Sequence, residues 1–202
     1  MTQRMHEIAT EIVRLQSELD GEIEKKRKAL GWRIRDDLVE FEHGIVEEHR
    51  RFRKNLRHFL AESPFYTTLS APVIYSLIVP FALMDLWVSV YQTICFRVYR
   101  IPLVRRANYV VIDRQHLAYL NHIEALNCIF CGYANGVIAY VREVASRTEQ
   151  YWCPIKHALR VSNPHERYWQ FLDYGDASGY RARLESFREK LRTLPDEGEV
   201  KA

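Results

Sequence analysis

The stretch APVIYSLIVPFALMDLWVSVYQTICF, residues 71–96, decides the fold of this chain. Asp85 is its single charged residue. As a helix rising about 1.5 Å per residue, it could cross the roughly 30 Å apolar core of a bilayer. Tyr75, Trp87 and Tyr91 suit the interface between lipid and water. The stretch predicts membrane contact. The alternative is a buried helical hairpin in a soluble protein, which Asp85 favours because a carboxylate is costly in lipid.

Basic residues without intervening acids lie on both sides of this stretch. They are Arg50, Arg51, Arg53, Lys54 and Arg57 before it, and Arg97, Arg100, Arg105 and Arg106 after it. Basic flanks tend to stay in the cytoplasm, so two such flanks conflict with a single crossing. Pro80, near the middle, removes a helical hydrogen bond. We therefore expect residues 63–106 to form an apolar helical hairpin that dips into one leaflet, at the cytoplasmic face of the bacterial inner membrane. A cytoplasmic location is the alternative.

Residues 1–62 are predicted to form an amphipathic helical or coiled-coil region. Apolar residues follow a 3-4-3-4 spacing and resume after a charged interval. They are Met5, Ile8, Ile12, Leu15, Leu19 and Ile23, then Ile34, Leu38, Phe41, Ile45, Phe52, Leu56 and Phe59. The pattern predicts a long helix or helical hairpin over residues 3–60. Its apolar stripe either packs on its own domain or binds a second copy or another protein.

The segment 107–194 is predicted to be a helical metal-binding domain, followed by a disordered tail over residues 195–202. After a short extended stretch we expect four helices. They run from Asp113 to about Asn127, from Tyr133 to Tyr151, onward from Cys153, and from Tyr180 to Leu194. The chain as a whole is therefore expected to be mostly α-helical.

Four residues have the spacing of a metal site. Cys128 and Cys131 are separated by two residues, and Cys153 and His157 by three. The first pair can reach one ion from a turn, and the second shares one face of a helix at i and i+4. Three cysteines and one histidine match the ligand count of a closed tetrahedral zinc site. We therefore predict a structural Cys3His zinc site, in which zinc fixes the C-terminal fold.

The same residues allow other chemistry. Cys95 in place of His157 would give four thiolates for an iron–sulfur cluster, with iron instead of zinc as the cofactor. Cys128 and Cys131 could instead act as a thiol–disulfide pair, although no thioredoxin-like pattern surrounds them. Acid-x-x-histidine pairs such as Asp113 with His116 also occur in di-iron bundles. The plainest alternative is that all four cysteines are small buried apolar side chains.

The strings NCIFCGYANG, residues 127–136, and RTEQYWCPIKHA, residues 147–158, resemble the signatures of a family of uncharacterised bacterial proteins. The resemblance runs from about Pro64 to about Gly175 and leaves the N-terminal region outside. It implies that these polar residues form one signature, and it implies no particular activity.

Composition and missing motifs narrow the function. A net charge of +3, from 29 basic and 26 acidic residues, gives no support to a strongly basic nucleic-acid-binding protein. The phosphate-loop, dinucleotide, nucleophile-elbow and HExxH patterns are missing, so we expect no nucleotide. The sequence favours a membrane-associated binding or scaffold protein. An iron-dependent or thiol-based redox enzyme at the membrane surface is the alternative, and whether the protein is an enzyme stays open.

Overall fold

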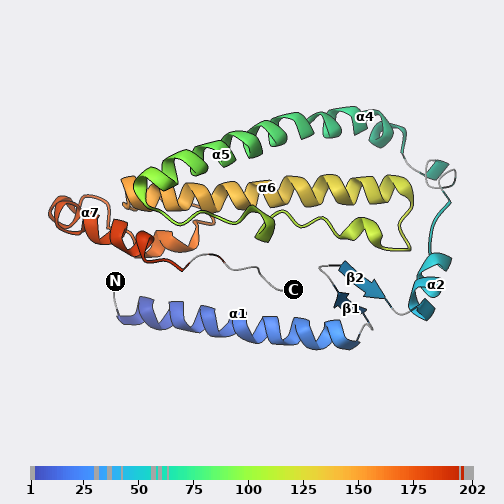
Figure 1. The fold of residues 1–202 in the computed structure, drawn as a ribbon, viewed down its shortest axis with the longest axis horizontal. Helices are drawn as coiled ribbons and strands as arrows, with labels where there is room; N and C mark the ends of the chain where they lie inside the picture. The colour runs from blue at the N-terminus through green and yellow to red at the C-terminus, as the bar shows by residue number, and fades with distance from the viewer. Residues whose placement is uncertain are drawn as a thin grey trace.

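The computed structural model describes residues 3–29, 32–35, 38–41, 43–55, 58, 61–62, 64–195 and 197. It confirms a mostly helical fold (Figure 1). The described elements are α1 (Gln3–Ala29), β1 (Trp32–Arg35), β2 (Leu38–Phe41), α2 (His43–Arg51), α4 (Phe65–Ser76), α5 (Ile78–Tyr99), α6 (His122–Trp152) and α7 (Ala177–Arg192), with short 3-10 turns η1 (Arg106–Asn108), η2 (Arg114–His116) and η3 (Glu166–Gln170).

The prediction of helix over residues 3–60 is confirmed for α1 and α2 and wrong between them. β1 and β2 form an antiparallel hairpin that pairs Trp32 with Phe41 and Ile34 with Val39. The run WRIR alternates apolar and charged residues with the period of a strand. A helical 4-3 spacing is also present in this region, at Ile34, Leu38 and Phe41. The same short segment therefore fits both the period of a helix and the period of a strand, and the sequence alone favours the helix. The predictions for Leu56 and Phe59 lie outside the described residues.

Helices α4 and α5 follow one another end to end (Figure 1). The break predicted from Pro80 is confirmed, because α4 ends at Ser76. In a continuous helix the Ser76 carbonyl would accept the N–H of residue 80, and proline has no N–H. The predicted return of the chain is wrong. Leu77 keeps right-handed helical angles, and Phe81 N–H donates to its carbonyl at 3.2 Å, so α5 continues the path of α4.

Helix α6 is one continuous helix where the sequence predicted two. Asn121 caps its start: its side chain accepts from the N–H groups of Ile123 and Glu124, each at 3.0 Å. The Glu124 carboxylate accepts the Asn121 N–H at 2.9 Å, which completes a capping box. Asn135-Gly136, a common turn pair, stays helical. A Cβ on Gly136 would lie 2.7 Å from the Tyr109 carbonyl oxygen, so glycine lets the extended chain before η2 pass close over the helix.

Two clusters of buried side chains hold the C-terminal part together. The first joins α5, α6 and α7 with the chain after α5, and consists of Phe96, Ile101, Val104, Tyr140, Val144 and Leu191. The second joins η3 and α7, and consists of Tyr168, Phe171, Leu172 and Phe187. The first cluster fixes α5 against α6, so it also determines which face of α5 points outward.

Candidate functional site

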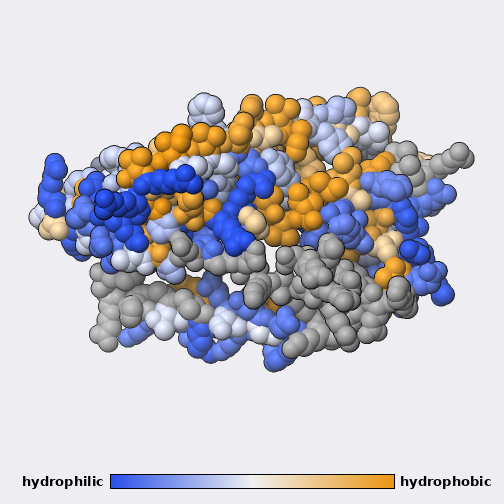
Figure 2. Space-filling view, in the orientation of Figure 1, coloured by the Kyte–Doolittle hydropathy of each residue, from blue (hydrophilic) through white to orange (hydrophobic). Residues whose placement is uncertain are grey.

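The outer surface of α4 and α5 is apolar and uncovered. Within Phe65–Tyr99, only 6% of the most apolar 18-residue stretch is buried. The core helix of a soluble protein would be mostly buried. Figure 2 shows the resulting apolar band over these helices. We call this surface the apolar face. Its large exposed side chains include Phe65, Tyr66, Leu69, Val73, Leu77, Leu83, Leu86, Trp87, Val90, Ile94 and Val98.

The inner surface of α5 carries polar residues. Asp85 accepts from Arg106 Nε at 2.8 Å, from Arg106 Nη2 at 2.7 Å and from the Tyr133 hydroxyl at 3.0 Å. The Asp85 side chain is 11% exposed and that of Arg106 is 43% exposed. The bidentate geometry is the strong form of a carboxylate–guanidinium pair. The one charge in the apolar stretch therefore faces protein and has a partner.

Gln92 lies two turns further along the same face of α5. Its amide oxygen accepts the Val104 N–H at 3.0 Å, and its amide nitrogen donates to the Val104 carbonyl at 3.2 Å and to the Tyr140 hydroxyl at 2.6 Å. The buried backbone after α5 is thereby satisfied. The inward side of α5 thus carries Asp85 and Gln92 beside the buried Phe96, whereas most of its large aliphatic side chains point outward, unlike those of a helix on the surface of a soluble protein.

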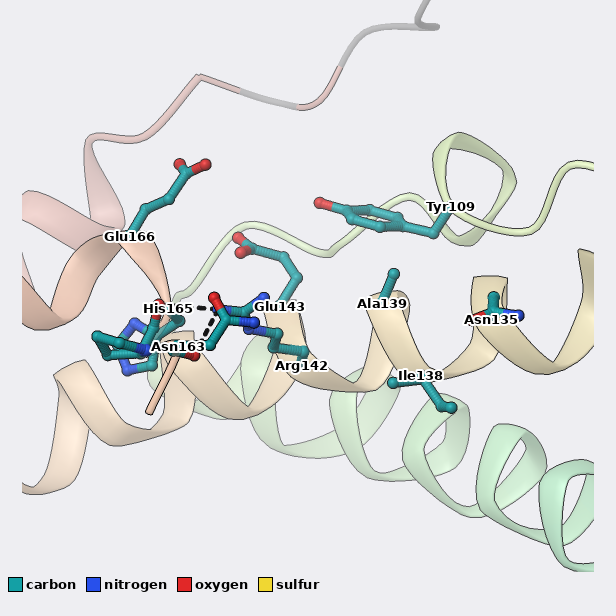
Figure 3. A pocket seen from close by; sticks show the side chains of 10 residues that line it. Tyr109, Asn135, Ile138, Ala139, Arg142, Glu143, Asn163, His165 and Glu166 are labelled. Atoms are coloured by element: carbon teal, nitrogen blue, oxygen red, sulfur yellow. Dashed lines mark hydrogen bonds between the residues drawn. The ribbon is translucent and has the colours of Figure 1, made fainter. Parts of the chain in front are cut away.

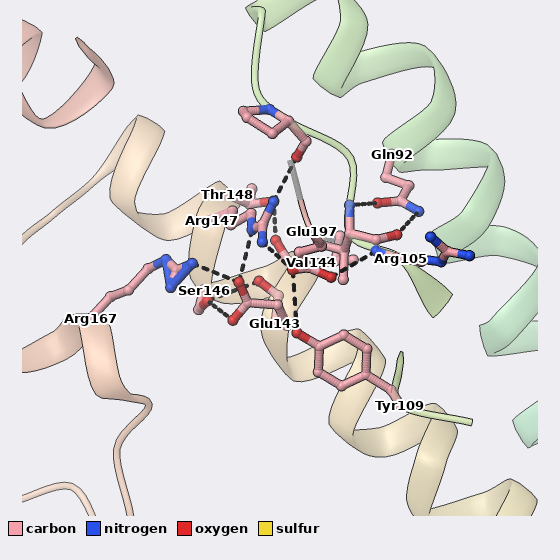
Figure 4. Close-up of polar contacts among 12 residues, drawn as sticks. Gln92, Arg105, Tyr109, Glu143, Val144, Ser146, Arg147, Thr148, Arg167 and Glu197 are labelled. Atoms are coloured by element: carbon pink, nitrogen blue, oxygen red, sulfur yellow. Dashed lines mark hydrogen bonds and ion pairs between the residues drawn. The ribbon is translucent and has the colours of Figure 1, made fainter. Parts of the chain in front are cut away.

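A second polar network surrounds Arg147 on α6 (Figure 4). Its guanidinium donates to Glu143 Oε1 at 2.8 Å and to the Pro102 carbonyl at 2.7 Å, and it pairs with Glu197. Arg167 Nη2 donates to the same Glu143 oxygen at 2.6 Å. Charged residues on a helix, such as Glu143 and Arg147, are most often exposed. Their i, i+4 spacing gives no sign that the Arg147 side chain is only 4% exposed.

Tyr109 joins this network from the chain before α6. Its hydroxyl donates to Glu197 Oε1 at 3.4 Å. Burial, together with the charges of Glu143 and Glu197, raises the pKa of Tyr109 to about 12. The phenol therefore stays protonated and remains a donor. Glu197 lies in the segment that the sequence assigned to a disordered tail, so at this residue the structure differs from that prediction.

A cavity of about 610 Å³ adjoins the network (Figure 3). Tyr109 and Glu143 line both the cavity and the network, and Glu166 and His165 line the far side. Arg142 also lines it, with Nη2 held by the carbonyls of Asn163 and Pro164 at 3.1 and 2.8 Å. A volume of this size is typical of small-molecule sites.

The structure does not bring the four predicted metal ligands together. Cys128 and Cys131 lie in the first half of α6, and Cys153 is the residue that follows its last turn. At about 1.5 Å per residue, Cys131 and Cys153 are on the order of 30 Å apart along the helix. Among the described residues, no group of three or more histidine, cysteine and acidic side chains is placed to hold a metal ion.

The Cys153–His157 pair also differs from its predicted geometry. No helix begins at Cys153, because the chain turns into an extended segment in which Ile155 pairs with Leu172. His157 donates its backbone N–H to the Tyr168 hydroxyl at 2.9 Å and stacks on that ring. Desolvation and the Glu149 carboxylate raise the pKa of the Cys153 thiol, which disfavours its free thiolate.

Comparison with family models, with curated proteins and with solved structures gives no match for this chain.

Proposed function

We propose that this protein binds a membrane surface through the apolar face of α4 and α5. One observation supports the proposal: the large apolar side chains of that face are exposed, whereas Asp85 and Gln92 point inward and bond to protein. Exposed apolar patches of this extent mark interaction sites for lipid or protein. Lipid suits it best, because α4 has no buried residue and its exposed side chains are apolar around much of its circumference.

The charged surroundings indicate that α5 lies in the plane of the membrane rather than across it. Arg114 and Asp85 both lie beside the same turn of α6. The Arg114 guanidinium is next to Gly132, because a Cβ on that glycine would lie 3.3 Å from Arg114 Nη2, and the next residue, Tyr133, donates a hydrogen bond to Asp85. Arg114 therefore lies level with Asp85, near the middle of the apolar run from Phe65 to Tyr99. A crossing helix would carry the exposed, non-helical chain around Asp113 and Arg114 to the middle of the bilayer, where such backbone and charge are strongly disfavoured.

Exposed basic residues lie on both sides of α4 and α5 in the sequence, and such cations suit anionic headgroups. Arg50, Arg51, Arg53 and Lys54 lie before α4, and Arg97 and Arg100 lie at the end of α5, all exposed. Each cation near an anionic surface contributes about 1 kcal/mol. Anionic lipid and a positive-inside bias both favour the cytoplasmic leaflet. In this proposal the protein is a binding or scaffold protein whose helical C-terminal part stands on the water side.

Flotation with lipid vesicles tests the proposal. The wild type should float with vesicles that contain anionic lipid. The double variant Leu86→Asp/Val90→Asp should stay in the dense fraction, because both side chains are exposed on the apolar face. Leu159→Asp is the matched control: Leu159 is also exposed, but it lies between α6 and η3. Circular dichroism checks that all three chains are equally helical.

A wild type that does not float, or a double variant that floats as well as the control, would contradict the proposal. If the wild type stays unbound and forms dimers that the double variant does not form, a second copy covers the apolar face instead. Depth is measured separately, in a variant whose other tryptophans, Trp32, Trp152 and Trp169, are replaced by phenylalanine, by comparing quenching of Trp87 by lipids brominated near the headgroup and near the chain end. Stronger quenching near the chain end would contradict the in-plane orientation.

A further inference from the structure

Glu197, which follows α7, sits in a cradle built from two separate parts of the chain, α6 and the connection between α5 and α6. Its carboxylate pairs with Arg147 of α6, accepts the Arg105 backbone N–H at 2.9 Å, and accepts the Tyr109 hydroxyl at 3.4 Å (Figure 4). The Glu197 side chain is largely buried there. A charged donor, an oriented amide and a hydroxyl converging on one carboxylate are the elements of an anion site.

The charge of the cradle requires an anion. Arg147 is almost fully buried, and an unpaired buried charge is strongly destabilising. Its other acidic partner, Glu143, is shared with Arg167, because one Glu143 oxygen accepts from both guanidinium groups. Two guanidinium groups and one carboxylate leave a net positive charge, which Glu197 neutralises.

The cradle shares two residues with the wall of the neighbouring cavity. Tyr109 and Glu143 belong both to the network around Arg147 and to the wall of the 610 Å³ cavity. Ile138 and Ala139 also line this cavity. Glu197 lies shortly after the end of α7, so its binding is intramolecular, with an effective concentration on the order of millimolar.

We propose that Arg147, the Arg105 N–H and Tyr109 form a binding site for a small organic anion, a carboxylate or a phosphate ester, and that Glu197 is its intramolecular occupant. A free ligand binds when it displaces the tail. The site uses residues outside the apolar face and does not depend on membrane binding.

Inorganic phosphate and acetate are the probes, added to the full chain at constant ionic strength with chloride as the balancing ion. Glu197→Gln leaves the cradle without a carboxylate. We expect the melting temperature of this variant to rise with phosphate or acetate, and the phosphorus resonance of phosphate to broaden. The wild type should show either effect only at concentrations at least about tenfold higher, because its own tail competes. Glu189→Gln, an exposed glutamate on α7, is the matched control and should behave as the wild type does.

Tyr109→Phe in the Glu197→Gln background identifies the site without removing the buried Arg147. Loss of one hydrogen bond to a charged group should weaken phosphate binding by about tenfold or more. Phosphate binding that is equal in Glu197→Gln, Glu189→Gln and the Tyr109→Phe double variant would place the anion elsewhere and overturn the proposal. A Glu197→Gln variant that responds to neither probe would overturn it as well.

Discussion

Replacing Asp85 with leucine tests whether the inner face of α5 packs as the structure shows. If Asp85 faced lipid, the leucine would remove a costly charge and strengthen both membrane binding and folding. In the structure, Asp85 instead accepts three hydrogen bonds, two from Arg106 and one from Tyr133, at 2.7–3.0 Å. A hydrogen bond to a charged group contributes about 1.5–3 kcal/mol. Because Arg106 is partly exposed, water can hydrogen-bond its guanidinium in the variant and replace part of the lost interaction energy.

We therefore expect Asp85→Leu to lower the free energy of unfolding by about 2–4 kcal/mol. For a chain of this length, that corresponds to a fall of roughly 5–15 °C in melting temperature. Thermal unfolding in mild detergent, followed by tryptophan fluorescence, measures it. A double-mutant cycle with Arg106→Met should give a coupling energy of about 1–3 kcal/mol. An unchanged or higher melting temperature for Asp85→Leu, or strictly additive single variants, would refute the inward orientation of Asp85.

Four further outcomes are expected from the contacts within and around α6. Gly136→Ala should destabilise the fold by about 1–3 kcal/mol in a urea titration, because its Cβ would lie 2.7 Å from backbone atoms of Tyr109 and Val110. Gly21→Ala is the control: no atom lies within 4 Å of its Cβ, so this variant should be neutral or slightly stabilised in the same titration. Asn121→Ala should cost about 1–2 kcal/mol through loss of the capping box, and a normal urea midpoint would contradict that role. The pKa of Tyr109 is about 12 when folded and near 10 when unfolded, so the unfolded chain releases this proton first as pH rises, and Tyr109 should contribute about 1–2 kcal/mol to the loss of stability between those values; Tyr109→Phe should make the loss smaller by that amount, while Tyr99, Tyr133 and Tyr140, whose pKa values are also raised, still contribute. Because α6 separates the two cysteine groups, a chelator should leave the melting temperature unchanged, and a fall that zinc reverses would show that the cysteines meet at a metal.

The apolar stretch and its break could be predicted from the sequence, but not the path after the break. Pro80 removes one hydrogen bond at a known position, and α4 ends there. What the chain does next depends on neighbours that are distant in sequence. Tyr75 bonds Asn127 and stacks edge-on against Phe130, and Phe81 contacts the same ring. These contacts with α6 hold the two helices in one line, and no local pattern encodes them.

The cysteine pattern shows the same limit for the candidate site. Spacing tells which side chains share a turn, and Cys128 with Cys131 do lie one turn apart on α6. It does not tell how far apart two such pairs are. Asn135-Gly136, a dipeptide that is common in turns, lies between the two pairs, yet it stays helical within α6. The backbone of Tyr109 and Val110 packs closely against α6 at Gly136, where a side chain would not fit. The helix therefore continues through Gly136, and Cys128 and Cys131 lie far from Cys153.

The magnitude of the membrane interaction follows from the outward side chains of α5. Moving a leucine, valine or isoleucine side chain out of water is worth about 1.5–3 kcal/mol. Leu83, Leu86, Val90 and Ile94 lie on one exposed side of the helix, so immersing these four alone would supply roughly 6–12 kcal/mol before the cost of association. Replacing Leu86 and Val90 with aspartate removes half of that gain and adds two charges that must stay hydrated. Each 1.4 kcal/mol is a factor of about ten in partitioning, so the double variant should bind vesicles at least about a hundredfold more weakly. A loss smaller than tenfold would mean that lipid does not cover this side of α5.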